Sequence, residues 1–386
     1  MSVPLAYNIR NLRVRWVSSI LTALCITAAT VIFLLLAAMS VGIERSLVGT
    51  GDPLNVIAMR TGVTAESQSL VTKKQVDDLL ALKGVARDAT GELLMSPELV
   101  VVAALPRIGK DKANAALRGV GPRAKALRPN LQVTEGRWFK PALGELVVGA
   151  GVASRFPWIK PGSELKFKGR TWKVVGLFSD GGQAYESEIW GDLDDFKAEY
   201  KREASAVLFR VERPGDVERV SRLIKDDKQF NLDARPQAEY FKSQNLAGGM
   251  MMFVSGIMGF VLSIGAIFGV ANTMYAAVIS RTREIATMRV LGFTRMAIWS
   301  AFVLESGFLG LVGGIVGAAL AYVGFNNFAT GTVNWMTFSD MAFKFQVTPT
   351  LMVAAVIMAV LMGLGGGLLP AWRASTVPIA RALRGL

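Results

Sequence analysis

The sequence predicts a polytopic α-helical membrane protein with four transmembrane helices and one α+β extracytoplasmic domain. Hydrophobic residues make up 52% of the 386 residues, and they concentrate in four long stretches that are nearly free of charge. Charged residues reach only 19%, below the roughly 25% of an ordinary soluble domain. The region between the first two stretches has the composition of a soluble domain, so we expect it to fold outside the bilayer.

The four apolar stretches predict the membrane spans. Each exceeds the ~20 residues that a helix needs to cross the hydrocarbon core. A cleaved signal peptide is the alternative for the first stretch, because basic residues precede it, but the apolar part of a signal peptide is only ~7–15 residues long. We therefore predict spans at residues 17–43, 247–279, 296–325 and 350–372.

The basic residues in the short segments outside the spans predict how the chain is oriented in the membrane. The segments 1–16, 280–295 and 373–386 together contain ten arginines and one acidic residue, Glu284. Short segments that are rich in Lys and Arg stay on the cytoplasmic side of the membrane. We therefore expect the chain to lie in the inner membrane, with both termini in the cytoplasm. The domain 44–246 and the short loop 326–349 then lie outside. The cations are Arg10, Arg13, Arg15, Arg281, Arg283, Arg289, Arg295, Arg373, Arg381 and Arg384.

The overall charge of +13 is mainly a consequence of this topology and argues against nucleic-acid binding. Histidine is absent, which removes the commonest general base and metal ligand. The single cysteine, Cys25, excludes a disulfide within the chain. Gly109-Lys110 lacks the glycine and Ser/Thr spacing of a phosphate-binding loop. We predict no catalytic, cofactor or metal site, and hence no enzyme activity in this chain.

Two strand–helix–strand units are predicted at the ends of the outer domain. The first comprises 54–60, 71–82 and 85–89; the second comprises 206–212, a helix from Pro214, and 230–234. Two such halves favour a split ferredoxin-like sheet with helices on one face. Between them lies a β-rich insertion, about 93–204, with strands at 145–148, 164–167, 171–178 and 187–190 and a helix from Leu193. The acids between Glu186 and Asp195 lack the spacing of an EF-hand, so calcium is not favoured.

Small residues one helical turn apart allow helix backbones to approach closely in a membrane. Glycine pairs with this spacing predict a dense bundle or a subunit interface: Gly265/Gly269, Gly310/Gly314, Gly313/Gly317 and Gly363/Gly367. Glu305 is the acid within a span, and such a carboxylate is a functional candidate. The alternative places it near the cytoplasmic interface, with Trp299 as an anchor and an arginine as its partner.

The loop 280–295 predicts a short amphipathic helix. Ile285, Met288 and Leu291 recur at helical spacing, with arginines on the other side and Gly292 at the expected stop. An interfacial helix attracted to anionic lipid is one interpretation of this pattern.

This loop resembles the permease subunits of MacB-like and FtsX-like ABC transporters, whose pattern is roughly R-x-R-E-I-x-x-x-R-x-L-G. The resemblance extends over nearly the whole chain. It continues through Leu304-Glu305, the glycine-rich 310–317, the closing segment Gly365 to Ala374 and Ala382-Leu383-Arg384, and it includes Asn11-Leu12-Arg13, Leu117 to Val120, Glu135-Gly136-Arg137 and Val174-Val175-Gly176. Trp372 departs from the family, which usually has a small or basic residue there.

The resemblance implies a porter-like outer domain, a homodimer, and a separate ABC ATPase subunit that carries the ATP and Mg. It also implies a coupling helix that transmits mechanical work across the membrane. The implied ATPase-coupling residues are Arg281, Arg283, Glu284, Ile285, Met288, Arg289, Leu291 and Gly292.

Several functions remain open from the sequence. The first is an export permease, working with a periplasmic adaptor and an outer-membrane channel. The others are an FtsX-type regulator of a cell-wall hydrolase, a permease that extracts lipoprotein or lipid from the outer leaflet, and a sensor or scaffold without transport.

Overall fold

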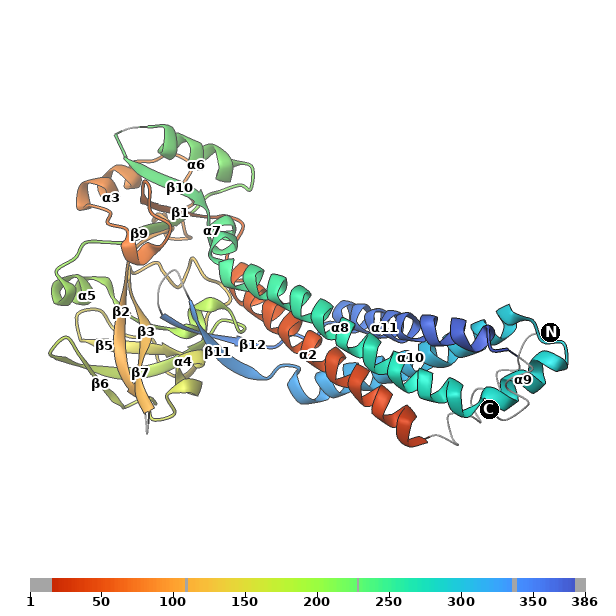
Figure 1. Ribbon diagram of the computed structural model, residues 1–386. Helices are drawn as coiled ribbons and strands as arrows, with labels where there is room; N and C mark the ends of the chain where they lie inside the picture. Colours follow the sequence, from red (N-terminus) through yellow and green to blue (C-terminus); the bar gives the residue numbers. More distant parts are fainter. Residues whose placement is uncertain (1–15, 108–109, 228, 335–338, 379–386) are drawn as a thin grey trace. The chain divides into compact units, whose positions relative to one another are not determined.

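The computed structural model describes residues 16–107, 110–227, 229–334 and 339–378 (Figure 1). The predictions made for Arg10, Arg13, Arg15, Arg381 and Arg384 therefore lie outside the described residues. The chain divides into two compact units. The helical unit takes the described parts of 1–40, 249–328 and 345–386, and the α/β unit takes 41–248 and 329–344.

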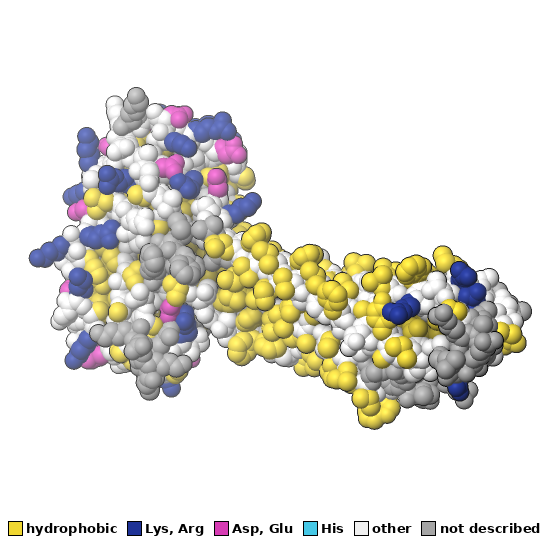
Figure 2. Space-filling model, viewed as in Figure 1, with side chains coloured by type: hydrophobic (Ala, Val, Ile, Leu, Met, Phe, Trp, Pro, Cys, Tyr) yellow, Lys and Arg dark blue, Asp and Glu magenta, His cyan; other side chains and the backbone are white. Residues whose placement is uncertain are grey.

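Four long apolar helices dominate the helical unit, and each is long enough to cross a membrane. They are α2 (Trp16–Val48, whose last turns belong to the α/β unit), α8 (Leu246–Ser280), α10 (Arg295–Phe325) and α11 (Pro349–Ser375). Figure 2 shows hydrophobic side chains covering much of the visible helical surface. Thr294 and Thr348 cap α10 and α11, and Pro349 occupies the first turn of α11, where its missing N–H costs nothing.

The helical unit has its own apolar core. Side chains from α2, α8, α10 and α11 meet there, with Ile285 of the short helix α9 (Thr282–Val290) at one end. This core includes small residues such as Ala359, Ala371 and Ala374 beside large ones such as Phe302, and small residues allow helices to approach closely.

The α/β unit contains the predicted split ferredoxin-like motif. Its sheet runs in the order β10-β1-β9-β2, every neighbouring pair being antiparallel. Helix α3 follows β1 and α6 follows β9, which gives two strand–helix–strand halves. The elements are β1 (Asn55–Arg60), α3 (Lys73–Leu80), β2 (Met95–Arg107), β9 (Ala206–Arg210), α6 (Asp216–Asp226) and β10 (Leu232–Pro236). The prediction of fold class is confirmed.

Strand β2 joins this motif to the insertion. Its first residues, Met95 to Glu98, pair with β9, and the rest pairs with β3 (Lys110–Val120). The sheet continues as β3-β8-β5-β7-β4, with β6 paired to β7. These strands are β4 (Gln132–Gly136), β5 (Glu145–Gly149), β6 (Glu164–Phe167), β7 (Arg170–Ser179) and β8 (Glu188–Asp192). The shared strand makes motif and insertion one continuous sheet.

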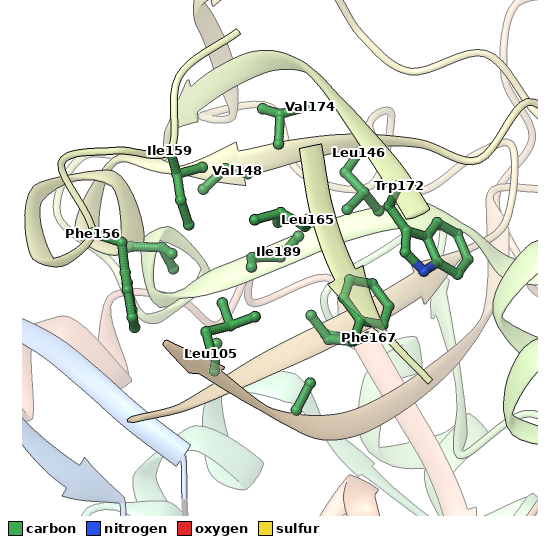
Figure 3. Close-up of a cluster of buried hydrophobic side chains, with 14 of the residues drawn as sticks. Leu105, Leu146, Val148, Phe156, Ile159, Leu165, Phe167, Trp172, Val174 and Ile189 are labelled. Carbon is green, nitrogen blue, oxygen red and sulfur yellow. The ribbon is translucent and has the colours of Figure 1, made fainter. Parts of the chain in front are cut away.

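An apolar core fills the insertion (Figure 3). Val148, Leu165, Trp172 and Ile189 lie in it, and the rings of Phe167 and Trp172 stack with centroids 5.0 Å apart. Helices α4 (Ala150–Arg155) and α5 (Leu193–Tyr200) border this core, and α7 (Gln237–Gln244) lies elsewhere in the α/β unit. The 3-10 turns are η1 (Glu66–Gln68) and η2 (Ala184–Ser187).

One local prediction was wrong, and another segment has more regular structure than the sequence indicated. The segment 85–89 forms isolated bridges, Val85 with Val211 and Arg87 with Leu93, and the strand begins ten residues later at Met95. The turn around Gly91, which has a positive φ, separates this segment from the start of the strand. The predicted loop 326–349 contains a hairpin, β11 (Ala329–Asn334) and β12 (Ser339–Lys344), which packs within the α/β unit. Arg155 pairs there with Asp340 at 3.1 Å.

Candidate functional site

The short helix α9 lies between α8 and α10, at one end of the helical unit (Figure 1). Glu284 stands in its first turn and Arg289 in its last, where each charge complements the helix dipole. The helix ends in a left-handed Gly292 with φ of +93°. The N–H of Gly292 bonds to the carbonyl of Arg289, and that of Phe293 to the carbonyl of Met288. This is a Schellman ending, which favours glycine at the left-handed position.

A buried ion pair fixes the start of α9 to α10. Arg281 Nη1 lies 3.1 Å from Glu305 Oε2, and both side chains are about 8% exposed. The Arg281 guanidinium also lies 5.8 Å from the centroid of the Phe302 ring. Because a buried charge is costly without a partner, this pair holds α9 and α10 in one register. The intramembrane acid thus has an arginine beside it.

A second polar contact fixes the other end of α9 to α11. Arg289 Nη1 donates to the backbone carbonyl oxygen of Ser375 at 2.8 Å. Ser375 is the last residue of α11, and the final carbonyls of a helix have no intrahelical donor. A cation at this position also suits the negative end of the helix dipole. Arg289 therefore caps α11 from a neighbouring helix.

Helix α9 consequently has two different faces. Ile285 and Ala286 are buried in the helical core, and Met288 is partly buried against it. On the other face Arg283, Glu284, Thr287 and Val290 are exposed, followed by Leu291 at 68% exposure and Gly292. One face is therefore attached to the bundle and the other presents charged and apolar groups.

The structure divides the eight predicted coupling residues between these roles. Arg281, Ile285 and Arg289 contact other helices, and Met288 is intermediate. Arg283, Glu284, Leu291 and Gly292 lie on the exposed side. The helical spacing of Ile285 and Met288 indicated the buried face, but Leu291 falls past the last helical turn and does not follow it.

Six of the eight predicted packing glycines face another helix. A Cβ added at Gly314 would lie 2.7 Å from the Cβ of Ala359, and one at Gly317 would lie 2.8 Å from Thr30 Cβ. Gly310 and Gly363 face each other across α10 and α11, Gly313 faces α2, and Gly367 faces Ser306. A Cβ at Gly265 or Gly269 would meet nothing within 4 Å. Sequence reasoning missed Gly366, which packs against Val270 of α8.

Comparison with known proteins places both units of the chain in described families. Residues 19–227, more than half of the chain, match the MacB-like periplasmic core domain. Residues 256–379 match the FtsX-like permease C-terminal family.

Two of three similar relatives carry these family names, and the other is named as an ABC transporter permease. An uncharacterized ABC transporter permease, MJ1507 of Methanocaldococcus jannaschii, is 32% identical over 49% of this chain and 50% of its own. The macrolide export ATP-binding/permease protein MacB of Hyphomonas neptunium is 31% identical over 54% of this chain and 29% of its own. The cell division protein FtsX of Streptococcus pneumoniae is 29% identical over 38% of this chain and 48% of its own.

The matches span about half or less of the length of these relatives, so their activities do not transfer directly. The family, in contrast, follows from the match over more than half of this chain, together with its four apolar helices and its mixed α/β domain. The chain belongs to the ABC transporter permeases of the MacB/FtsX type.

Proposed function

We propose that this chain couples ATP hydrolysis by a separate ATPase subunit to movement of its α/β domain, for export or extraction of substrate from the periplasm or outer leaflet. The observation that carries the proposal is the division of α9 into a bonded and an exposed face. A helix of this kind can receive a push from a partner and pass it to the bundle.

The bonded face supplies the transmission. Displacement of α9 acts on α10 through Arg281 and Glu305, and on α11 through Arg289 and Ser375. The buried Arg281–Glu305 pair resists separation because a lone buried charge is costly, and the part-buried Arg289–Ser375 contact adds a charged hydrogen bond. Tightly packed helices move as units rather than deform. The motion therefore reaches the far ends of α10 and α11 instead of being absorbed at α9.

The exposed face supplies the docking surface. Glu284 and Arg283 offer charges, while Val290 and Leu291 offer apolar area beside them. A polar rim around apolar contacts is the composition of a protein interface. We assign this face to the ATPase, with ATP and Mg held by that partner.

The arginines at the α9 end of the helical unit support an orientation of the chain in the membrane. Arg281 precedes α9, Arg283 and Arg289 lie within it, and Arg295 follows it. Arg373 lies in the last turn of α11. Short segments rich in arginine stay in the cytoplasm. In this proposal α9 and both termini are cytoplasmic, and the α/β domain is periplasmic or extracellular.

The assembly we propose is a homodimer with an ATPase pair. The relative named for macrolide export supports an export role, in which a periplasmic adaptor and an outer-membrane channel would join the complex. The relative named as a cell division protein supports the second candidate, regulation of a cell-wall hydrolase. Isolation of the native complex separates them, since an adaptor indicates the first and a hydrolase the second. Recovery of the ATPase with a lipoprotein or lipid would indicate extraction.

The coupling role is tested by Glu284→Ala/Arg289→Ala in the complex with its ATPase, reconstituted in lipid nanodiscs. Spin labels on the α/β domains of the two protomers report movement on ATP addition. We expect the complex to assemble but ATP hydrolysis to proceed without the distance change seen in the wild type. Arg222→Ala, on the exposed face of α6, is the control. Normal coupled movement in the double variant would refute the proposal.

A further inference from the structure

Three carboxylates converge on the guanidinium of Arg118, where the split ferredoxin-like motif meets the insertion. Arg118 Nη1 lies 2.5 Å from Glu66 Oε2 and 2.7 Å from Glu98 Oε2. Its Nε lies 2.7 Å from Glu188 Oε2. The four side chains are between 2% and 13% exposed. The contact therefore joins β3, η1, β2 and β8 inside the α/β unit.

This cluster carries one excess negative charge when all of its acids are ionised. Arg128 is the second cation, and its terminal nitrogens bond to both oxygens of Glu98, at 2.7 and 2.8 Å. Three carboxylates therefore face two guanidinium groups. Asp180 is a separate acid near Arg128, and a proton on it leaves this count unchanged. Because an uncompensated buried charge is costly, one acid of the cluster is expected to take up a proton.

The hydrogen bonds identify Glu66 as that acid. Glu98 accepts three charged hydrogen bonds from the two arginines. Glu188 accepts two from Arg118 and one from Trp190 Nε1, the last at 2.8 Å. The Glu66 carboxyl accepts one from the described residues, donated by Arg118. Hydrogen bonds to a carboxylate favour its ionised form, so Glu66 is the acid whose ionised form is least stabilised.

The pKa shifts agree with this count. Burial raises the pKa of Glu66, with Arg118 opposing the rise and Glu98 and Glu188 adding to it. Burial also acts on Glu98, but Arg128 and Arg118 hold the pKa of that carboxyl below its ordinary value. Two acids on one guanidinium are thus pushed apart, so that Glu98 is ionised while Glu66 keeps its proton to a higher pH.

A cavity of about 50 Å³ borders Glu66 and has room for water, which can accept the proton. Tyr240 of α7 and Asp340 of β12 also line this cavity. Burial raises the pKa of Tyr240 well above its ordinary value, so this phenol stays neutral. Asp340 is paired with Arg155 at 3.1 Å.

Glu66 lies in the middle of the segment 64–69, which is attached to helix α7. The N–H of Glu66 donates to the Tyr240 hydroxyl at 3.4 Å, and Gln244 Nε2 donates to the first carbonyl of the segment at 2.6 Å. Arg202 donates to two carbonyl oxygens near the other end of the segment, both at 3.1 Å. One residue separates α7 from the long apolar helix α8. A change at Glu66 therefore acts directly on the part of the domain that precedes α8.

We propose that Glu66 is a proton-dependent latch. With a proton on its carboxyl, the segment 64–69 stays closed over Arg118 and remains attached to α7. Loss of the proton leaves the excess negative charge in the cluster, and opening of the segment relieves it by bringing Glu66 into water. Opening thus releases one proton, so a rise in pH favours the open state. The latch lies within the α/β unit and does not depend on the transport role.

The direction of the shift sets the pH range of the latch. In the open state Glu66 faces water and ionises near its ordinary pKa of 4.5, whereas the closed state keeps the proton to a higher pH. The closed state is therefore fully stable at low pH and loses stability as the pH rises. The open-to-closed ratio should grow about tenfold for each pH unit above 4.5, until the closed-state carboxyl also ionises.

Infrared spectroscopy tests for the proton directly. The full chain is titrated in dodecyl maltoside micelles, which contain no ester carbonyl. We expect the C=O stretching band of a protonated carboxyl to persist above pH 4.5 in the wild type and to be lost in Glu66→Gln. Asp180, whose pKa burial raises to about 7, should contribute a second band, which Asp180→Asn identifies.

Hydrogen exchange of the same chain tests the latch. Protection factors remove the intrinsic pH dependence of exchange, and we follow them in peptides covering 64–69 and α7. From about pH 5.5 to about pH 8.5 they should fall by at least about tenfold in the wild type. Glu66→Gln is uncharged at every pH and should abolish this fall, whereas Asp180→Asn should retain it.

Glu188→Gln tests the charge count with Glu66 still present. Two carboxylates then face two guanidinium groups, so the Glu66 band should vanish at a lower pH and the fall in protection should shrink. Absence of a Glu66 band above pH 4.5 would overturn the proposal. An equal fall in protection in Glu66→Gln, or a wild-type response of Glu188→Gln, would also overturn it.

Discussion

The Arg289 guanidinium lies 2.8 Å from the carbonyl oxygen of Ser375, although the two residues are 86 positions apart in the chain. This one contact connects the short helix α9 to the end of α11. With the Arg281–Glu305 pair on α10, it attaches both ends of α9 to the bundle. Helix α9 is therefore positioned by tertiary contacts as well as by its own sequence.

Loss of the Arg289 cap should loosen α9. The Arg289→Ala change removes a charged hydrogen bond, worth about 1.5–3 kcal/mol in proteins. We expect faster amide hydrogen exchange in peptides covering α9 and the last turn of α11, measured in nanodiscs by mass spectrometry. Arg283→Ala, exposed on the same helix, should leave both rates near wild type. Equal exchange rates in the two variants would show that the Arg289 cap does not stabilise α9.

The Arg281–Glu305 pair predicts a stability effect for Glu305→Gln. This change removes the carboxylate charge that faces the buried Arg281 guanidinium, and breaking a buried pair costs about 3–5 kcal/mol. We expect a lower unfolding midpoint, and partial recovery in Arg281→Met/Glu305→Met, which removes both charges. A proton-relay role for Glu305 makes the opposite prediction: transport lost in Glu305→Gln while the unfolding midpoint is unchanged.

Two glycine pairs should respond differently to a larger side chain. At Gly314 a leucine would overlap Ala359, and overpacking costs about 1–3 kcal/mol. Gly314→Leu should therefore lower the unfolding midpoint. Gly265→Leu should not, because nothing in the described chain lies within 4 Å of a Cβ there. If Gly265 and Gly269 lie at the proposed dimer interface, Gly265→Leu should weaken self-association instead, measured by single-molecule photobleaching in liposomes.

Asp180 predicts a pH-dependent gain in stability on mutation. Burial raises its pKa from 3.8 to about 7. The folded state then keeps this proton between those values while the unfolded state loses it, so the wild type loses stability as the pH rises from about 4 to 7. Asp180→Asn should raise the unfolding midpoint at pH 8.5 and change it little at pH 4.5. The same increase in the unfolding midpoint at both pH values would contradict a raised pKa of Asp180.

The sequence predicted the elements whose physical signal is local. Four charge-poor stretches longer than a bilayer leave little alternative to helices, and α10 and α11 begin at threonine caps that can be recognised in the sequence. The second strand–helix–strand half, and the first strand and helix of the other half, were likewise visible in the spacing around Pro214 and Val71.

The missed elements depend on distant contacts. Strand β2 contains the uninterrupted apolar run Leu99 to Leu105, so it lacks the alternation that marks a strand with one exposed face. Arg118 looks like a solvated charge in the sequence, yet three carboxylates from different elements surround it. A polar pocket of the α/β unit, lined by Asn55, Arg128 and Asp180, combines residues that are far apart in the chain, and no spacing rule brings them together.

The most direct test of the coupling account is site-specific photo-crosslinking in the assembled complex. A photoreactive benzoylphenylalanine replaces Leu291 on the exposed side of α9, or Val323 near the opposite end of α10 as a control that is 84% exposed. We predict a crosslink to the ATPase subunit from position 291 and none from 323. Crosslinking from 323 but not from 291 would place the ATPase elsewhere and contradict the account.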